Sequence, residues 1–130
     1  EKEAEEKGVE AAKDLVMKMD PNILRLTREK PDVAVRIRQM VSDYSGWHLV
    51  NVDPCRSLDP PAIERLQEIR IPTLIITGEH DSSDFHRIAD ILNRKIQNSK
   101  RITMKGAGHT PNMETPREFN KTVLGFLADV

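Results

Sequence analysis

The chain has 130 residues, of which 38% are hydrophobic and 32% are charged, and its formal net charge is −1. This composition is leaner in apolar residues than an average globular domain, so the chain can build only a modest core. Interleaved charges that nearly cancel give no indication of a nucleic-acid or membrane partner. The single cysteine, Cys55, excludes a disulfide within the chain and favours a reducing, cytoplasmic compartment. No apolar run reaches the roughly 18–20 residues of a membrane-spanning helix.

Residues 1–70 are predicted to form short helices and loops. In residues 1–18 charged residues surround one narrow apolar stripe, which is typical of a surface helix. This stripe contains Val9, Ala12, Val16 and Met19. Asp20 followed by Pro21 predicts the N-cap and first position of a second helix, and Pro31 predicts the start of a third. The apolar stripe of the third helix contains Val33, Ile37, Met40 and Tyr44. Helices this short must pack on one another or on something larger.

Residues 45–58 contain glycine, proline, asparagine and aspartate without periodicity, so we predict a loop there. Trp47 and His48 lie in this loop and Tyr44 directly precedes it, and we take all three as candidates to line a substrate pocket. An equally good interpretation makes Trp47 a local core anchor and leaves His48 in solvent. A short helix is predicted over residues 59–68.

Residues 71–130 alternate between strand and helix patterns. Residues 71–77 form an apolar, β-branched run that ends at Gly78, which is typical of a strand covered on both faces. A helix over residues 85–97, capped by Asp84, and a strand over residues 101–104 follow. The stripe of this helix contains Phe85, Ile88, Ile91, Leu92 and Ile96.

The strand–helix–strand order predicts a parallel pair of strands. Two parallel strands are not a self-sufficient sheet, so we expect further strands from another chain or from sequence outside these 130 residues. Residues 115–118 form a capping box, with Pro116 at the first helical position, and this box opens a last helix. Its inward side chains are predicted to be Phe119, Val123, Phe126 and Leu127.

Asp81 and His109 each follow the carboxyl end of a predicted strand. Open α/β sheets carry their chemistry at these ends, so we expect both side chains at one edge of the sheet. A carboxylate beside an imidazole fixes its tautomer and stabilises the imidazolium that forms during proton transfer. Turn aspartates and lone histidines are also common as structural residues. Asp84 is the alternative acid in the same turn.

Two segments carry a resemblance to a known family. Residues 72–81 read PTLIITGEHD and residues 106–116 read GAGHTPNMETP. They resemble the C-terminal end of the α/β-hydrolase family, in which a Gly-x-x-Asp turn bears the triad acid and a Gly-x-Gly-His loop bears the triad histidine. The resemblance is close over residues 71–130 and weaker over residues 1–70, which look like the mobile cap of the family.

The resemblance implies an α/β fold class. The expected architecture is a partial α/β-hydrolase fold, with a helical cap segment (residues 1–70) before a strand–helix–strand–helix unit of a parallel sheet (residues 71–130). It also implies that His109 is the catalytic base and that Asp81 orients it. No metal or cofactor is expected. Gly106 and Gly108 would allow the sharp loop that presents the ring.

The nucleophile of the family lies in a Gly-x-Ser-x-Gly elbow, upstream of the acid and the histidine. No serine of this chain has glycines two positions before and after it; the serines are Ser42, Ser45, Ser57, Ser82, Ser83 and Ser99. Since a triad without its nucleophile loses orders of magnitude in rate, the chain alone is expected to be inactive. The first residue, Glu1, is not methionine, which favours a chain that begins inside a longer reading frame.

The preferred interpretation is therefore the C-terminal part of a cofactor-independent hydrolase. Its small-molecule substrate would be an ester, a lactone or a related carbonyl compound. Dehalogenases, epoxide hydrolases and non-hydrolytic members of the family share the same acid and histidine positions, and the residue at the elbow separates them. A second interpretation is half of an enzyme that another chain completes. The third is a non-catalytic oligomerisation or partner-binding module, such as a dimer, that assembles through exposed strand edges.

Overall fold

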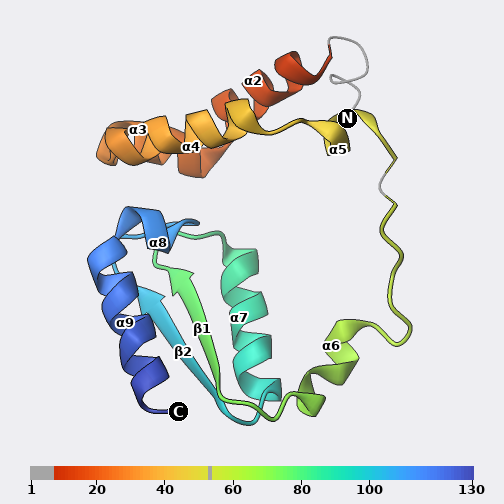
Figure 1. Cartoon of the computed structure of the whole chain (residues 1–130), viewed down its shortest axis with the longest axis vertical. Coiled ribbons are helices and arrows are strands. Elements are labelled where there is room, and N and C mark those ends of the chain that lie inside the picture. The colour runs from red at the N-terminus through yellow and green to blue at the C-terminus, as the bar shows by residue number, and fades with distance from the viewer. Residues whose placement is uncertain (1–7, 53) are drawn as a thin grey trace. The chain divides into compact units, whose positions relative to one another are not determined.

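The computed structural model describes residues 8–52 and 54–130, so the predicted helical structure of residues 1–7 lies outside the described residues. The chain forms two compact units, Glu1–Arg56 and Ser57–Val130 (Figure 1). Their boundary lies earlier in the chain than the expected one after residue 70. The reason is that the intervening residues bind to the second unit. Lys95 Nζ donates to the carbonyl of Ile63 at 3.0 Å, and Asn98 Nδ2 donates to the carbonyl of Arg70 at 2.9 Å.

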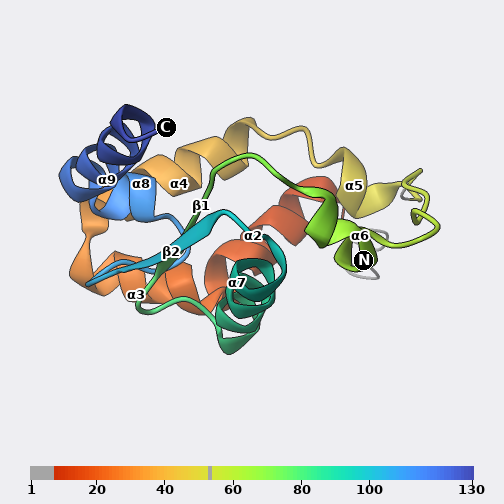
Figure 2. The same ribbon diagram turned by 90° about the horizontal axis from the view of Figure 1, so that it is seen from below.

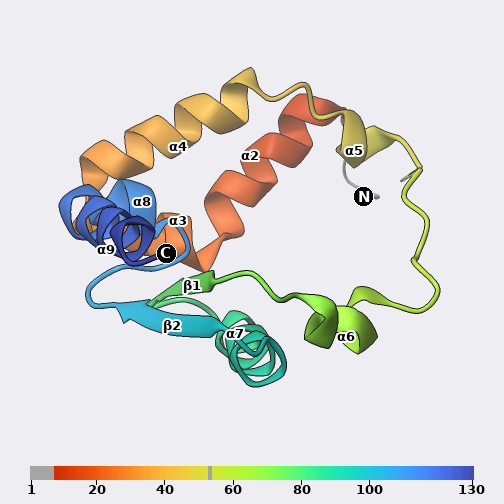
Figure 3. The ribbon, with the colours of Figure 1, turned by 60° about the horizontal axis from the view of Figure 1, so that its bottom comes forward.

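The first unit is helical. It contains α2 (Val9–Met19), α3 (Pro21–Glu29), α4 (Pro31–Asp43) and the short α5 (Trp47–Val50). The short α3 connects α2 to α4 and contacts both (Figure 3). The buried apolar side chains of this unit are Ala12, Met17, Ile23, Leu26, Val33 and Ala34.

The predicted start of α3 is confirmed. The Asp20 carboxylate accepts hydrogen bonds from the amides of Asn22 at 2.8 Å and Ile23 at 3.1 Å, which satisfies two amides of the first turn. Proline occupies the first turn of both α3 and α4, as predicted, because its fixed φ fits a helix start and its missing N–H costs nothing there.

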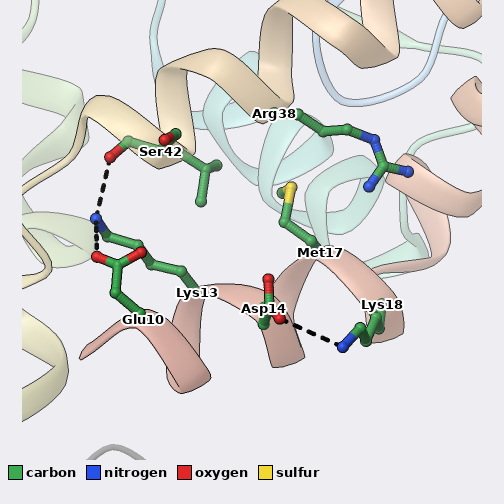
Figure 4. A pocket seen from close by; sticks show the side chains of 8 residues that line it. Glu10, Lys13, Asp14, Met17, Lys18, Arg38 and Ser42 are labelled. Carbon is green, nitrogen blue, oxygen red and sulfur yellow. Dashed lines mark hydrogen bonds and ion pairs between the residues drawn. The ribbon is translucent and has the colours of Figure 1, made fainter. Parts of the chain in front are cut away.

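The predicted apolar stripe of α2 is only partly correct. Ala12 is buried, but Val16 and Met19 are exposed, and Lys13 and Met17 are buried in their place. Lys13 reaches the interior because its ammonium finds two acceptors, Glu10 Oε1 at 3.0 Å and the main-chain oxygen of Ser42 at 3.1 Å (Figure 4). A long lysine stem can cover apolar surface while its charged end is satisfied.

The segment predicted as a loop over residues 45–58 contains one turn of helix, α5. Gly46 precedes it with a φ of 71°, in the left-handed region. A Cβ atom on residue 46 would lie 2.0 Å from Cγ1 of Val9, so glycine also allows the close approach to α2.

The second unit contains the sheet. Its elements are α6 (Ala62–Arg65), η1 (Leu66–Glu68), β1 (Thr73–Gly78), α7 (Ser83–Lys95), β2 (Ser99–Met104), α8 (Pro111–Glu114) and α9 (Pro116–Ala128). The strands are parallel, as predicted, with Thr73 opposite Ser99 and Gly78 opposite Met104. Helix α7 covers one side of the two strands, and α8 and α9 lie on the other side (Figures 1 and 2). The buried apolar residues are Ile75, Ala89, Ile96, Met104 and Ala107.

Two predicted caps differ in the structure. The N-cap of α7 is Ser82 and not Asp84, because the helix begins earlier than expected and already includes Asp84 in its first turn. Thr115 precedes α9 as predicted, but it makes no capping bond with its side chain. The Thr115 hydroxyl instead donates to the carbonyl of Pro111 at 3.0 Å, which ties it to α8.

Helix α9 has no buried residue within the described structure. Leu127, predicted to face inward, is exposed, as is Leu124. In residues 8–52 and 54–130 no helix combines the length and the apolar character that crossing a bilayer requires.

Candidate active site

Two loops meet at the carboxyl ends of the parallel strands. The first follows β1 and carries Asp81, and the second follows β2 and carries His109. Because Gly78 and Met104 are paired in the register, both strands end at the same level of the sheet. The chain therefore delivers a carboxylate and an imidazole to one place.

The Asp81 and His109 side chains are hydrogen bonded. Nδ1 of His109 lies 3.0 Å from Oδ1 of Asp81, which confirms the predicted adjacency. The Asp81 side chain is 6% exposed, whereas the His109 side chain is 47% exposed. The amide of Ser82 also donates to Asp81 Oδ1, at 2.8 Å, and so helps to hold the carboxylate. Nε2 of His109 has no hydrogen-bond partner among the described residues. The arrangement fixes one nitrogen of the ring and leaves the other available.

Two main-chain hydrogen bonds and one bond from a main-chain amide to a side chain connect the two loops. The amide of Glu79 donates to the carbonyl of Met104 at 2.9 Å, and the amide of His80 donates to the carbonyl of Ala107 at 2.8 Å. In return the amide of Gly106 donates to Glu79 Oε2 at 2.8 Å. The Asp81–His109 distance is therefore set by the backbone of both loops and not by the two side chains alone.

Two glycines make this contact between the loops possible. Gly106 has a φ of 66°, in the left-handed region, in agreement with its predicted role in the turn. Gly78 lies so close to the second loop that a Cβ atom there would be 2.0 Å from the carbonyl oxygen of Gly108 and 2.6 Å from that of Ala107. Only a residue without a side chain fits at the end of β1.

Glu114 supports the histidine loop from within the fold. Its Oε2 accepts a hydrogen bond from the amide of Gly108 at 2.9 Å. Its Oε1 accepts from the amide of Thr110 at 3.1 Å and from the Thr110 hydroxyl at 3.1 Å. Glu114 is 7% exposed. Sequence reasoning used Glu114 only as part of a motif, because nothing local indicates that its carboxylate bonds on both sides of residue 109.

An apolar hollow of about 230 Å³ lies beside the pair. It is lined by Ile75, Ile76, Thr77, Asp81, Phe85, Ile88, Ala89, Leu92, His109 and Pro111. The Phe85 ring, from the first turn of α7, lies 4.5 Å from the His109 ring between centroids and at 49° to it. Sequence reasoning placed Phe85 in the apolar stripe of its helix and missed this contact, which a helical periodicity cannot reveal.

The alternative acid does not approach the ring. The side chain of Asp84 is 81% exposed and lies 3.9 Å from the guanidinium of Arg87. His80 is 47% exposed and lies 3.9 Å from Glu79. Of the acids in this turn, Asp81 is the one whose carboxylate contacts the ring of His109.

The three candidate substrate-binding residues lie in the first unit and contact one another. Tyr44 Oη is 2.5 Å from Nδ1 of His48, and the Trp47 ring meets the His48 ring edge-on at 5.3 Å between centroids. Tyr44 is 40% exposed and Trp47 is 45% exposed. Their expected role in substrate binding stays a prediction.

No metal site is evident in the described parts of the chain, where no group of three His, Cys, Asp or Glu side chains could hold an ion. Cys55 is exposed. The Asp81–His109 pair offers proton transfer at an oriented imidazole.

No protein-family model matches the chain. Among curated proteins, mouse "Monoacylglycerol lipase ABHD6" is 39% identical over 67 residues, which cover 52% of this chain and 20% of that protein. A Bacillus subtilis protein named "Putative 2-succinyl-6-hydroxy-2,4-cyclohexadiene-1-carboxylate synthase" is 35% identical over 71 residues, which cover 55% of this chain and 26% of that protein. The matched region is therefore a minor part of these relatives.

Solved structures match more of the chain. MenH from S. aureus has a TM-score of 0.76 and 27% identity, over 94% of this chain and 46% of its own. A thermophilic esterase from Thermogutta terrifontis has a TM-score of 0.75 at 22% identity, over 98% of this chain and 47% of its own, which supports the fold alone. This chain thus spans about half the length of the structures that it matches. The described residues have the fold of the C-terminal part of the α/β-hydrolase family.

Proposed function

We propose that this chain is the C-terminal part of a hydrolase that cleaves an ester, a lactone or a related carbonyl substrate. The observation that carries the proposal is the 3.0 Å contact between Nδ1 of His109 and the largely buried Asp81 carboxylate. The nucleophile would come from outside this chain. A sequence relative named as a monoacylglycerol lipase supports the substrate class.

In the proposed reaction, Nε2 of His109 accepts the proton of the nucleophile as it attacks the substrate carbonyl carbon. The same nitrogen then returns the proton to the leaving group, and a water molecule activated in the same way releases the acyl group. Asp81 stays ionised throughout, holds Nδ1–H and stabilises the imidazolium. The half-exposed ring suits this role because Nε2 must face a group that the chain does not itself supply.

The first unit would act as the cap of the complete enzyme. Its amphipathic helices would cover the reacting groups and exclude water, which strengthens electrostatic interactions at the site. Tyr44, Trp47 and His48 would contribute to the substrate pocket. This assignment depends on the resemblance of residues 1–70 to a cap.

The test uses the full-length protein, made from this chain together with the coding sequence upstream, and p-nitrophenyl esters as substrates. Asp81→Asn should lower kcat by about 10⁴-fold, because the imidazole loses the tautomer that the reaction needs. His109→Ala should cost at least as much. Matched controls are Asp84→Asn and His80→Ala, the same changes at exposed neighbouring positions, and we expect them to retain activity.

Several results would overturn the proposal. Full activity in His109→Ala would exclude His109 as the base. If kcat fell strongly in Asp84→Asn but not in Asp81→Asn, the acid of the triad would be Asp84 and not Asp81. Esterase activity of residues 1–130 alone that His109→Ala abolishes would show that the nucleophile lies in this chain. An upstream sequence without a nucleophile elbow would favour a non-catalytic, partner-binding module.

A further inference from the structure

We propose that Glu114 is the positioning residue that keeps the His109 ring in register with Asp81; the inference rests on the proposed function, which assigns the proton transfer to His109. Glu114 lies on α8, outside both the acid turn and the histidine loop. Its carboxylate accepts hydrogen bonds from the amides of Gly108 and Thr110, the residues on either side of His109. The backbone that carries the ring is thereby held at two points.

The two carboxylate oxygens have separate tasks. Oε2 accepts from Gly108 at 2.9 Å, and Oε1 accepts from the amide and the hydroxyl of Thr110, both at 3.1 Å. A carboxylate is the side-chain group that can accept at both oxygens at once. Because Glu114 is 7% exposed, water is poorly placed to replace it as the acceptor.

This geometry explains why an amide should fail at position 114. Glutamine has the same shape, but one of its two terminal atoms is a donor. If the amide nitrogen replaces Oε2, the Gly108 amide faces a donor; if it replaces Oε1, the Thr110 amide does. The Thr110 hydroxyl can rotate and accept, but a backbone N–H cannot. Glu114→Gln must therefore release one side of the loop in either orientation.

The acid turn after β1 also contacts the histidine loop, but it does not hold the residues next to His109. Oε2 of Glu79 accepts a hydrogen bond from the histidine loop, donated by the amide of Gly106 at 2.8 Å. The Glu79 side chain is 45% exposed, so water can take its place, and it holds the loop at one point only, three residues before the ring. Glu114 is the carboxylate that holds both immediate neighbours of His109.

The test is a nuclear magnetic resonance experiment on residues 1–130 with ¹⁵N-labelled histidine. Long-range ¹H–¹⁵N correlations separate the two imidazole tautomers, and comparison with His109→Ala assigns one of the four histidine signals to His109. In the unmodified chain we expect the Nδ1–H tautomer with a proton signal protected by Asp81. In Glu114→Gln we expect that signal to be lost while the amides of β1 and β2 stay protected from hydrogen exchange.

Two further variants make the result specific. Glu118→Gln is the matched control, since residue 118 is exposed on the same C-terminal segment, and it should leave the His109 signal unchanged. Thr110→Val removes the hydroxyl bond but keeps both amide bonds, so it should also keep the signal. An equal loss in Thr110→Val would assign the effect to the hydroxyl and refute the role given to the two amides.

A measurement on the unmodified chain guards against a Glu114→Gln variant that does not fold. The Gly108 and Thr110 amides should exchange with solvent at least about tenfold more slowly than in an unstructured chain, as expected for amides bonded to a carboxylate. Rapid exchange of both in the folded chain would refute the inference without any variant.

The outcomes for Glu114 and for the proposed function are distinct. If Asp81→Ala removes the His109 Nδ1–H signal but Glu114→Gln leaves it, the positioning role is wrong and the Asp81–His109 pair stands. If the unmodified chain lacks the Nδ1–H tautomer, the pair on which the proposed function rests is itself absent.

Discussion

Gly78 is the residue at which the two loops come closest, and its lack of a side chain is a geometric requirement. A Cβ atom there would overlap the backbone carbonyls of Gly108 and Ala107, which cannot rotate away as a flexible side chain could. The histidine loop would have to shift, and with it the ring that faces Asp81. A position without chemistry of its own thus controls the geometry of the pair.

We predict that Gly78→Ala destabilises the second unit by about 1–3 kcal/mol, as overpacking does in a close-packed interior. Hydrogen exchange of the slowest amides in β1 and β2 measures this free energy. The same variant should weaken the His109 Nδ1–H signal. A stable variant with an unchanged signal would show that the loops tolerate the side chain.

Gly125→Ala is the matched control for this prediction. Residue 125 lies in α9, and a Cβ atom there would meet nothing within 4 Å. Because alanine is the better helix former, this variant should be about 0.5–1 kcal/mol more stable. Replacing glycine by alanine should therefore lower the stability of the unit at residue 78 and raise it at residue 125.

At the scale of residues, the sequence predicted the Asp81–His109 pair because strand ends and a family motif both point to it. It could not predict Glu114 or Phe85. Their contacts arise from the turn of α8 and from the start of α7, and neither follows from periodicity. For the same reason the sequence predicted the wrong cap for α7. All four residues 81–84 are good N-cap types, and only the start of the helix decides between them.

At the scale of elements, helix starts were predictable where proline marks them. Pro21, Pro31 and Pro116 each lie in the first turn of their helix, as predicted. The inner face of α2 was not predictable, because its buried lysine depends on an acceptor at the end of another helix. The amphipathic pattern of α2 depends on its own sequence, so it does not indicate a contact with a residue 29 positions away.

Lys13 joins α2 to the C-terminal end of α4, and we predict that this contact contributes to the stability of the first unit. Its bond to the carbonyl of Ser42 satisfies one of the acceptors that a helix leaves open at its end. Lys13→Met keeps most of the stem and removes the charge. It should cost about 1 kcal/mol, since charge-assisted bonds that are shielded from water contribute more than exposed ones.

Lys18→Met is the control on the same helix. Nζ of Lys18 lies 3.4 Å from Oδ2 of Asp14 (Figure 4). The two side chains are 73% and 72% exposed. Exposed pairs contribute about 0–1 kcal/mol, so this variant should be close to the unmodified chain. Urea unfolding followed by the fluorescence of Trp47, the single tryptophan, reports on this unit. If both variants changed the free energy of unfolding equally, the Lys13–Ser42 contact would contribute no more than an exposed ion pair.

In the molecule as a whole, the two strands differ in how many exposed polar residues they carry, and this difference bears on which strand lies at the edge of the sheet. In β1, Ile75, Thr77 and Gly78 are buried, whereas β2 exposes Lys100 and Thr103. Natural sheet edges carry charged residues such as lysine, which discourage further pairing. We propose that β2 is the true edge and that a strand from outside this chain adds to β1.

The edge of β1 that is unpaired in the described structure bears on how the chain associates. Residues 1–130 alone should self-associate, because the described structure leaves the outer edge of β1 without a strand and exposes Leu124 and Leu127 on α9. Light scattering after size exclusion, at several concentrations, measures the mass. Co-expression with the upstream segment should replace self-association by a one-to-one complex. A chain that stays monomeric at all concentrations would argue that its edges need no partner.

The register of β1 and β2 has a consequence for how such proteins can vary. The turn between α7 and β2, at Asn98, lies at the end of the sheet opposite to Asp81 and His109. Insertions or deletions there would change the number of residues between the acid and the imidazole without changing their distance. We therefore expect related proteins to tolerate a changed number of residues between the acid and the imidazole, because the ends of the two strands keep the reacting groups in place.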